Sequence, residues 1–454
     1  MHGMTTTPQV YRYLRPSTIA SGRLGLATSG GVTTQGAAAN PDFFTGFLQH
    51  PETAATGLLA TAAVARARYF QPGLASLRDP VVTCDGDGLR FESFSSCGGV
   101  YARFDVASAA LDGEMRDRGT TNVDFNAALC EALAKVGGRD PLRLNVGAEE
   151  LSVTTTDTKV TEKKVPLPQR WLRGFAEVQV ITPRFDLRAE LSAPEATRFL
   201  RSLPTGEQAA DIVWLSVAGR GLRRTSRPAP GAVCLAGPSR LETLRPLLRF
   251  AKSLRVYGPP VTHSAPPTAS AWELVLPDMR LMLTLSPEPR RGFSGEGAVL
   301  DALIDDAVES DAELIGNLLD FRPYIDIAVL ADTSGLSPQR VRAALTQLGT
   351  AGRVGYDVAN ASFFHRELPY DADKVEQLNP RLRNARALAR SGAVHITGDI
   401  ANVTSRDKRY QVRLDADGLP AGCTCRWWAE HRGERGKCKH VLAVHMSLNG
   451  SDES

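Results

Sequence analysis

The apolar residues of this chain alternate with polar residues over some segments and recur with a helical period over others. Within residues 1–165, strand-like alternation or short apolar runs occur at 81–84, 89–94, 100–106, 142–146 and 151–165. Helical patterns predict helices at 51–70 and 121–136, the second with Asn122 or Asp124 as its N-cap. Residues 1–165 are therefore predicted to form an α+β N-terminal domain.

A second α+β region is predicted over residues 166–292. Its predicted strands lie within 175–191, 213–217, 232–235 and 274–285. Ser192 followed by Pro194 marks a helix start, and Ser239 with Glu242 forms a capping box that predicts a helix to residue 255. That helix would carry a basic stripe, for which a solvated face is favoured over a binding surface: Arg245, Arg249, Lys252 and Arg255.

Residues 293–370 show a different order of elements. The pattern predicts a long helix at 299–319, a second helix at 324–330 and a tight turn at 334–336. A third helix at 337–350 and two strands at 353–358 and 362–368 follow. This order resembles a winged helix, which implies a recognition helix at 337–350 and a wing tip at 358–362. Only Arg340 and Arg342 supply charge to that helix, and the wing tip has no Lys or Arg. A packing or protein-contact role therefore stays open beside DNA binding.

Residues 371–454 contain the most specific pattern of the chain. A helix is predicted at 371–390 and strands near 394–396, 403 and 410–414. Two cysteines one residue apart are followed, after twelve residues, by a third cysteine and a histidine: Cys423, Cys425, Cys438 and His440. Three thiolates and one imidazole are a closed tetrahedral set for one structural Zn²⁺. Cys423 and Cys425 can share one strand face, and the other two precede an apolar run that predicts a short helix. His431 is an alternative ligand, and buried or oxidised cysteines are the alternative to a metal.

The Cys-x-Cys and Cys-x-His pairs, their spacing and the following Val-Leu-Ala-Val run resemble the bacterial SWIM zinc finger family. The resemblance implies a small ββα zinc module that binds DNA or protein. The whole layout is similar to bacterial proteins of this family, some of which are thought to act with MoxR-type ATPases and von Willebrand A-domain proteins. A protein–protein adaptor is therefore the alternative to a nucleic-acid-binding protein.

Charge limits where nucleic acid can bind. The 454 residues carry a formal net charge of only +3, so a binding surface must be local. Residues 381–440 hold thirteen Lys and Arg against six Asp and Glu. The candidate contact residues are Arg426, Trp427, Trp428, Arg432, Arg435, Lys437 and Lys439.

The two Trp are expected on a strand, pointing to opposite faces, where one could stack on a base or anchor a partner. The alternative, given equal weight, is that both Trp side chains fill the core of a small module.

Several functional classes receive no support from the sequence. The first 35 residues lack a basic start followed by an apolar core, so we expect no signal peptide. No apolar run is long enough to cross a membrane. The other cysteines are far apart and fit a reduced cytoplasmic protein. Catalytic motifs are absent, Cys97 has no neighbouring His, and no small-molecule substrate is evident. We therefore predict a multidomain, non-enzymatic zinc protein that binds nucleic acid, with DNA favoured, or that binds protein.

Overall fold

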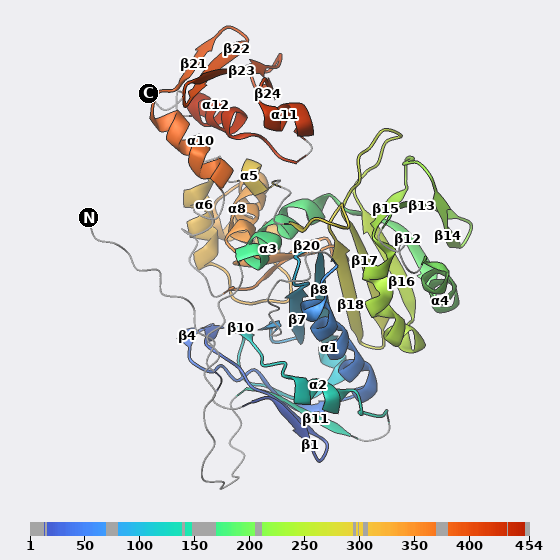
Figure 1. The fold of residues 1–454 in the computed structure, drawn as a ribbon. Coiled ribbons are helices and arrows are strands. Elements are labelled where there is room, and N and C mark those ends of the chain that lie inside the picture. The colour runs from blue at the N-terminus through green and yellow to red at the C-terminus, as the bar shows by residue number, and fades with distance from the viewer. Residues whose placement is uncertain are drawn as a thin grey trace.

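A computed structural model describes residues 13, 16–69, 80–138, 141–147, 169–204, 211–293, 297, 299–302, 307–368, 380–433 and 435–449. The chain is a mixed α+β protein with several sheets, as the sequence predicted (Figure 1). The predicted boundaries at residues 165, 292 and 370 remain predictions. The predicted strand at 151–165 and the first part of the helix at 371–390 lie outside the described residues. Among the described residues, no helix is both long enough and apolar enough to cross a membrane.

The first part of the chain forms short strands, two helices and the start of a large sheet. Its elements are β1 Thr18–Ala20, β2 Arg23–Leu26, β3 Gly31–Thr33, β4 Gly36–Ala38, β5 Phe44–Leu48, α1 Pro51–Arg66, β6 Val81–Cys84, β7 Gly88–Phe94, β8 Val100–Ala107, η1 Ser108–Ala110, β9 Leu111–Met115, β10 Gly119–Asn122, α2 Ala127–Leu133 and β11 Leu142–Val146. Asn126 caps α2, because its side chain accepts the Leu129 N–H. The prediction that Asn122 or Asp124 caps this helix is wrong, since Asn122 ends a strand.

The next part adds the strands that complete the large sheet. Its elements are α3 Gln169–Ile181, η2 Thr182–Arg184, β12 Asp186–Ser192, α4 Ala193–Ser202, β13 Ile212–Ala218, β14 Gly221–Thr225, β15 Val233–Ala236, η4 Pro238–Phe250, β16 Ser253–Gly258, β17 Ser270–Leu276 and β18 Met279–Leu285. The predicted strand at 175–191 is wrong over residues 175–181, which belong to α3. The helix predicted from Ser239 to Arg255 is a 3-10 helix that ends at Phe250, and Arg255 lies on β16. The basic stripe is therefore not one helix face.

A ten-stranded sheet joins these two parts. Its order is β12-β16-β17-β18-β8-β7-β6-β10-β3-β4. At its centre β8 and β18 pair antiparallel from Val100 with Leu285 to Val106 with Met279. Helix α1 packs so closely on this sheet that a Cβ at Gly57 would lie 2.3 Å from the Phe104 ring. This close approach places the helix against the buried apolar residues of β7 and β8.

The segment after the sheet comprises α5 Val299–Ala302, α6 Ala307–Asn317, α7 Ile327–Ser334, α8 Pro338–Thr350, β19 Val354–Asp357 and β20 Ser362–His365. Ser337 caps α8, and Gly335, which ends α7, has φ +73°, a value that favours glycine. Buried apolar side chains of α6, α7, α8 and the hairpin form one cluster. Ion pairs fix the hairpin to the ten-stranded sheet, with Arg103 2.7 Å from Asp357 and Arg366 2.6 Å from Glu92.

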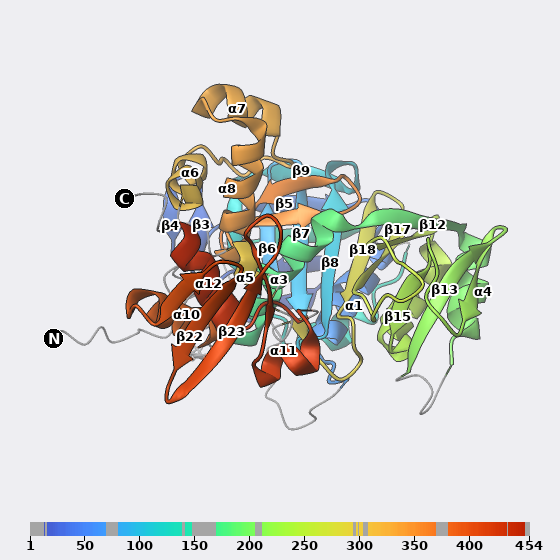
Figure 2. The same cartoon turned by 90° about the horizontal axis from the view of Figure 1, so that it is seen from above.

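The last part forms a separate four-stranded antiparallel sheet with three helices. Its elements are α10 Pro380–Arg390, β21 Val394–Thr397, β22 Ile400–Ser405, β23 Lys408–Leu414, β24 Pro420–Cys423, α11 Arg426–His431 and α12 Lys439–Asn449. We call residues 380–449 the zinc module. Val441 and Val444 of α12 pack on the sheet, whereas Leu442 and Ala443 face α10, α5 and α3. Figures 1 and 2 accordingly place the sheet at the outer end of the module.

Candidate metal centre

Four side chains from three places in the zinc module converge on one point. The thiols of Cys423, Cys425 and Cys438 and a ring nitrogen of His440 all lie within 4.8 Å of one another. Tetrahedral Zn²⁺ with ordinary bond lengths places N and S ligands ~3.6 Å apart. The Cys423 Sγ to His440 Nδ1 distance is 3.7 Å. The donor set and this spacing therefore fit one structural zinc ion, and His440 would supply Nδ1.

Secondary structure positions the ligands in two pairs. Cys423 ends β24, and Cys425 is the N-cap of α11, where its Sγ accepts the Trp428 N–H at 3.5 Å. The prediction that both cysteines lie on one strand is therefore wrong for Cys425. Cys438 plays the same capping role for α12, since its Sγ accepts the Val441 N–H at 3.5 Å. Helix N-termini favour a thiolate, because their free N–H groups and dipole stabilise negative charge.

The surroundings of His440 hold its ring in place. The ring is buried and stacks on Tyr410, with centroids 4.1 Å apart and planes 21° apart. Within the described residues, Nε2 is buried and has no hydrogen-bond partner. His431 does not reach the cluster but packs edge-on against Trp427 instead. His440 is thus the histidine of the set, as the sequence predicted.

The three thiols differ in acidity before a metal binds. Hydrogen bonds from Cys423 and Cys438 lower the pKa of Cys425 far below its ordinary value. The pKa of Cys423 is raised, chiefly because its S–H group donates to Cys425. Zn²⁺ binds thiolates, so binding of the ion to this set releases thiol protons.

The two tryptophans lie on helix α11 and not on a strand, so the expectation that they point to opposite strand faces is wrong. Trp427 donates its indole N–H to the Gly436 carbonyl at 3.3 Å. The guanidinium of Arg381 lies 4.5 Å from the Trp427 ring centroid, and that of Arg435 lies 5.3 Å away. Trp428 is half-buried and packs against Gly433. Trp427 therefore helps to attach the segment that contains Arg435 and Gly436 to α10.

The basic contact candidates differ in exposure. Arg426 and Arg432 are exposed, and Arg426 pairs with Glu430 at 2.6 Å. Lys439 is half-buried and donates to Ser405 at 2.8 Å. Lys437 lies 3.3 Å from a ring nitrogen of His445, and the Arg435 carbonyl accepts from Arg381. Their contact role is a prediction, and five of the seven candidates are at least half-buried.

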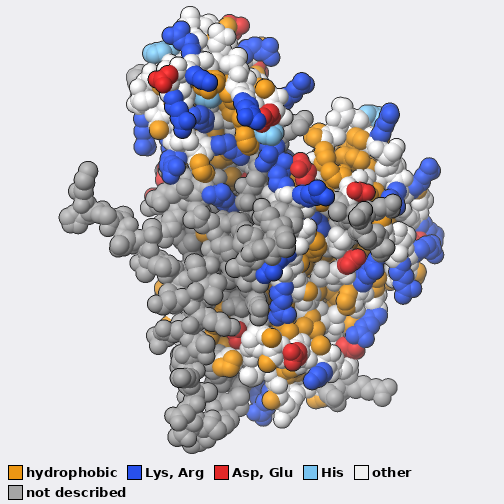
Figure 3. All heavy atoms as spheres, viewed as in Figure 1, with side chains coloured by type: hydrophobic (Ala, Val, Ile, Leu, Met, Phe, Trp, Pro, Cys, Tyr) orange, Lys and Arg blue, Asp and Glu red, His pale blue; other side chains and the backbone are white. Residues whose placement is uncertain are grey.

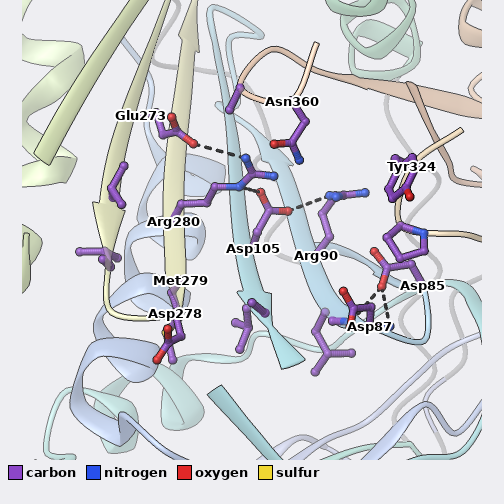
Figure 4. Close-up of a pocket in the computed structure, with 18 of the residues that line it drawn as sticks. Asp85, Asp87, Arg90, Asp105, Glu273, Asp278, Met279, Arg280, Tyr324 and Asn360 are labelled. Atoms are coloured by element: carbon purple, nitrogen blue, oxygen red, sulfur yellow. Dashed lines mark hydrogen bonds and ion pairs between the residues drawn. The ribbon is translucent and has the colours of Figure 1, made fainter. Parts of the chain in front are cut away.

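A second candidate site lies far from the zinc module, on the ten-stranded sheet. It is a cavity of about 580 Å³ lined by residues of β7, β8, β16, β17 and β18, by the β6–β7 turn, and by Tyr324 and Asn360. Arg90 and Arg280 approach Asp105 from opposite sides at 2.7 and 2.8 Å (Figure 4). Arg103 also pairs with Asp105, and Asp357 and Glu273 pair with Arg280, so three arginines face three carboxylates. No local pattern predicted this cluster, because its members are distant along the chain.

Comparison with known proteins supports the assignment of the zinc site. Residues 410–449 match the sequence model of the SWIM zinc finger family. The chain therefore carries a SWIM zinc finger whose Cys₃His cluster is compatible with one structural zinc ion. No curated protein matches the chain.

One solved structure that matches the chain is proliferating cellular nuclear antigen from Entamoeba histolytica, at 10% identity. The match has a TM-score of 0.32 and covers 55% of this chain and 100% of that chain. A TM-score of this size does not establish a common fold.

Proposed function

We propose that the zinc module binds nucleic acid, with DNA preferred, and that its zinc ion maintains the fold of the binding surface. The supporting observation is the excess of positive charge, thirteen Lys and Arg against six Asp and Glu over residues 381–440. Figure 3 shows Lys and Arg side chains spread over the upper part of the molecule, where the zinc module lies. Such a surface attracts phosphates by counterion release.

The zinc ion has a structural role in this proposal. Four protein ligands complete a tetrahedral site, which leaves no position for a water or a substrate. Catalysis by the metal would need such an open position. We therefore propose that the zinc site is not catalytic, because its three thiols and one imidazole already supply four ligands.

We propose that the segment from α6 to β20 is a winged helix that serves mainly for packing. Ile325 pairs with Phe363, which adds the short first strand expected of such a fold. Asp311 accepts two hydrogen bonds from Arg340 of α8, at 2.6 and 2.8 Å. The wing tip lies against the ten-stranded sheet, where Val358 is buried. One of the two basic side chains of α8 is thus already engaged, which favours the zinc module as the binding surface.

The test is fluorescence anisotropy with labelled single-stranded and double-stranded DNA at two salt concentrations. Zinc-loaded protein should bind, the affinity should fall steeply with salt, and a Cys438→Ser variant should lose binding because the module no longer folds. Arg342→Ser in α8 should leave the affinity unchanged. No binding by the zinc-loaded protein even at low salt would refute the proposal.

A protein–protein adaptor, working with MoxR-type ATPases and von Willebrand A-domain proteins, is the function that such a result would favour. Partner binding that survives high salt and depends on exposed apolar side chains would then be expected. Leu187 and Val217 are about half exposed and would be the first positions to change.

A further inference from the structure

The outer face of the four-stranded sheet of the zinc module has no helix packed against it in the described part of the chain. Side chains of β22 and β23 alternate between buried and exposed. Ala401, Val403 and Val412 face α12. The outward side chains that are exposed are His395, Thr397, Ile400, Thr404, Arg409, Gln411 and Arg413. We call this surface the outer sheet face.

The register of the strands arranges polar groups in rows across this face. His395 pairs with Asn402, which pairs with Gln411, so one ring and two amides lie side by side. The next row contains Ile400 opposite Arg413. Amide and imidazole groups both donate and accept hydrogen bonds, as do the edges of nucleobases.

The charge of the outer sheet face has one sign. Strands β21 to β24 contain no Asp or Glu. Within the described residues, Arg409 and Arg413 have no ion-pair partner, whereas Arg426 on α11 is paired with Glu430. The nearby carboxylates lie in the turns at the ends of the strands, at Asp399, Asp407, Asp415 and Asp417. Unpaired guanidinium groups beside amides favour a phosphate backbone over an apolar protein surface.

An aromatic ring lies at one edge of the same face. Gly422 pairs with Arg413, and a Cβ added to Gly422 would lie 3.8 Å from Nε1 of Trp428. The indole therefore sits beside the row that contains Arg413. An arginine next to an aromatic ring at the rim of a sheet is suited to an unstacked base, which can stack on the ring while its phosphate meets the guanidinium.

The width of the sheet selects the form of nucleic acid. Four strands spaced ~4.8 Å apart give a face about 14 Å across between the outer strands. The major groove of B-form DNA is ~12 Å wide and admits a helix or a two-stranded ribbon. We propose that the outer sheet face binds single-stranded nucleic acid, a refinement that rests on the proposed function.

The experiment compares two pairs of arginine substitutions in the full-length zinc-loaded protein. The probes are a fluorescein-labelled 20-nucleotide DNA of mixed sequence and the duplex formed with its complement. Arg409→Ser/Arg413→Ser removes two cations from the outer sheet face, and Arg426→Ser/Arg432→Ser removes two from α11 and its C-cap. Both variants should retain one zinc per chain, because none of the four residues is a ligand.

The wild type should bind the single strand more tightly than the duplex. The sheet variant should weaken single-strand binding and reduce the slope of log K against log salt by about 1.4, since each lost phosphate contact contributes ~0.7. The α11 variant should change that slope by less. Thr404→Glu, which adds a carboxylate to the outer sheet face, should also weaken binding and provides a second test if the double variant loses zinc.

Two results would overturn the inference while leaving the proposed function intact. One is tighter binding of the duplex, and the other is loss of binding in the α11 variant with the sheet variants unaffected. A wild type that binds neither probe would instead refute the proposed function itself.

Discussion

At the residue scale, Glu92 and Arg366 form an ion pair that is fully enclosed among the described residues. Both side chains are fully buried, and their closest atoms are 2.6 Å apart. Tyr101 donates its hydroxyl to the same Glu92 oxygen, and Arg366 also donates to the Val354 carbonyl at 3.2 Å. The pair links β7 to the chain just after β20. An ion pair buried in this way stabilises little in net terms, but the loss of one partner leaves the other as an unpaired charge that is shielded from solvent.

We predict that Arg366→Met lowers the free energy of unfolding by about 3–5 kcal/mol, because the Glu92 carboxylate would remain buried without its partner. Urea denaturation would measure the loss. Adding Glu92→Gln to this variant should restore part of the stability, since the uncompensated charge is removed.

The matched control is Arg322→Met, which removes an arginine from the exposed pair with Asp320 and should leave the free energy of unfolding almost unchanged, because solvent screens an exposed ion pair. Equal losses for the two single variants would contradict the importance of the buried pair.

The metal ligands support a second prediction at this scale. Replacing one of the three thiols by a hydroxyl should remove most of the zinc, because Zn²⁺ in such sites requires thiolate ligands. We expect Cys438→Ser to reduce zinc from one per chain to a small fraction, measured by mass spectrometry of the metal. Cys130→Ser, which changes a buried cysteine outside the cluster, should retain the full zinc content. Full zinc in the Cys438→Ser protein would exclude Cys438 as a ligand.

At the scale of elements, prediction from sequence succeeded where one face of an element is exposed. The alternation in β22 and β23 is clear because Ala401, Val403, Val412 and Leu414 face the core, whereas Ile400, Thr404, Gln411 and Arg413 are exposed. It failed for α3, whose Trp171, Phe175, Val178 and Gln179 are all buried. Trp171, Phe175 and Val178 are spaced as on one face of a helix, but the alternation of Val178 and Val180 with polar residues suggested a strand instead.

Side-chain partners distant along the chain could not be predicted at all. Glu92 and Arg366 are 274 residues apart, and no local pattern connects them. The zinc ligands were predictable because their spacing alone identifies the chemistry. Trp427 was predicted to lie on a strand, whereas it lies on the helix α11 that Cys425 caps. This helix is too short to be predicted from its sequence pattern.

The hairpin of β19 and β20 supports a prediction about pH. Burial alone would raise the pKa of Asp357, but Arg103 and Arg280 outweigh burial and lower that pKa to about 2. A carboxyl whose pKa is lower in the folded state stabilises the protein above its unfolded pKa of ~3.9 and loses this contribution as the pH falls through the folded value. We therefore expect about 2 kcal/mol of stability to disappear between pH ~4 and pH ~2.

The free energy of unfolding as a function of pH, measured for the wild type and for Asp357→Asn, would check this expectation. The difference between the two proteins isolates Asp357 from the other carboxylates. It should be largest near neutral pH and should shrink as the pH falls. Parallel curves would show that Asp357 contributes nothing to the acid sensitivity.

At the scale of the whole molecule, the zinc module and the ten-stranded sheet are stabilised by different means. The sheet is covered by two large clusters of buried apolar side chains. The cluster of the zinc module is small and includes Cys425 and Cys438 themselves, so the metal ligands are part of its core. A module of this size lacks the buried apolar area to fold without its ion.

Chelation should therefore unfold the zinc module and leave the rest of the chain folded. In hydrogen exchange followed by mass spectrometry, we expect amides of β22, β23 and α12 to lose their protection in excess EDTA, whereas those of β8 and β18 keep theirs.

The contacts between the zinc module and the rest of the chain predict an intermediate change in the exchange of α5. Arg381 of α10 donates to the Arg435 carbonyl at 2.8 Å, and Gly436 lies against Gly297, which precedes α5. Amides of α5 should thus gain exchange rate on chelation, although less than those of the zinc module. Unchanged protection of β22 and β23 would mean that the sheet folds without the metal, and the zinc ion would then have no structural role.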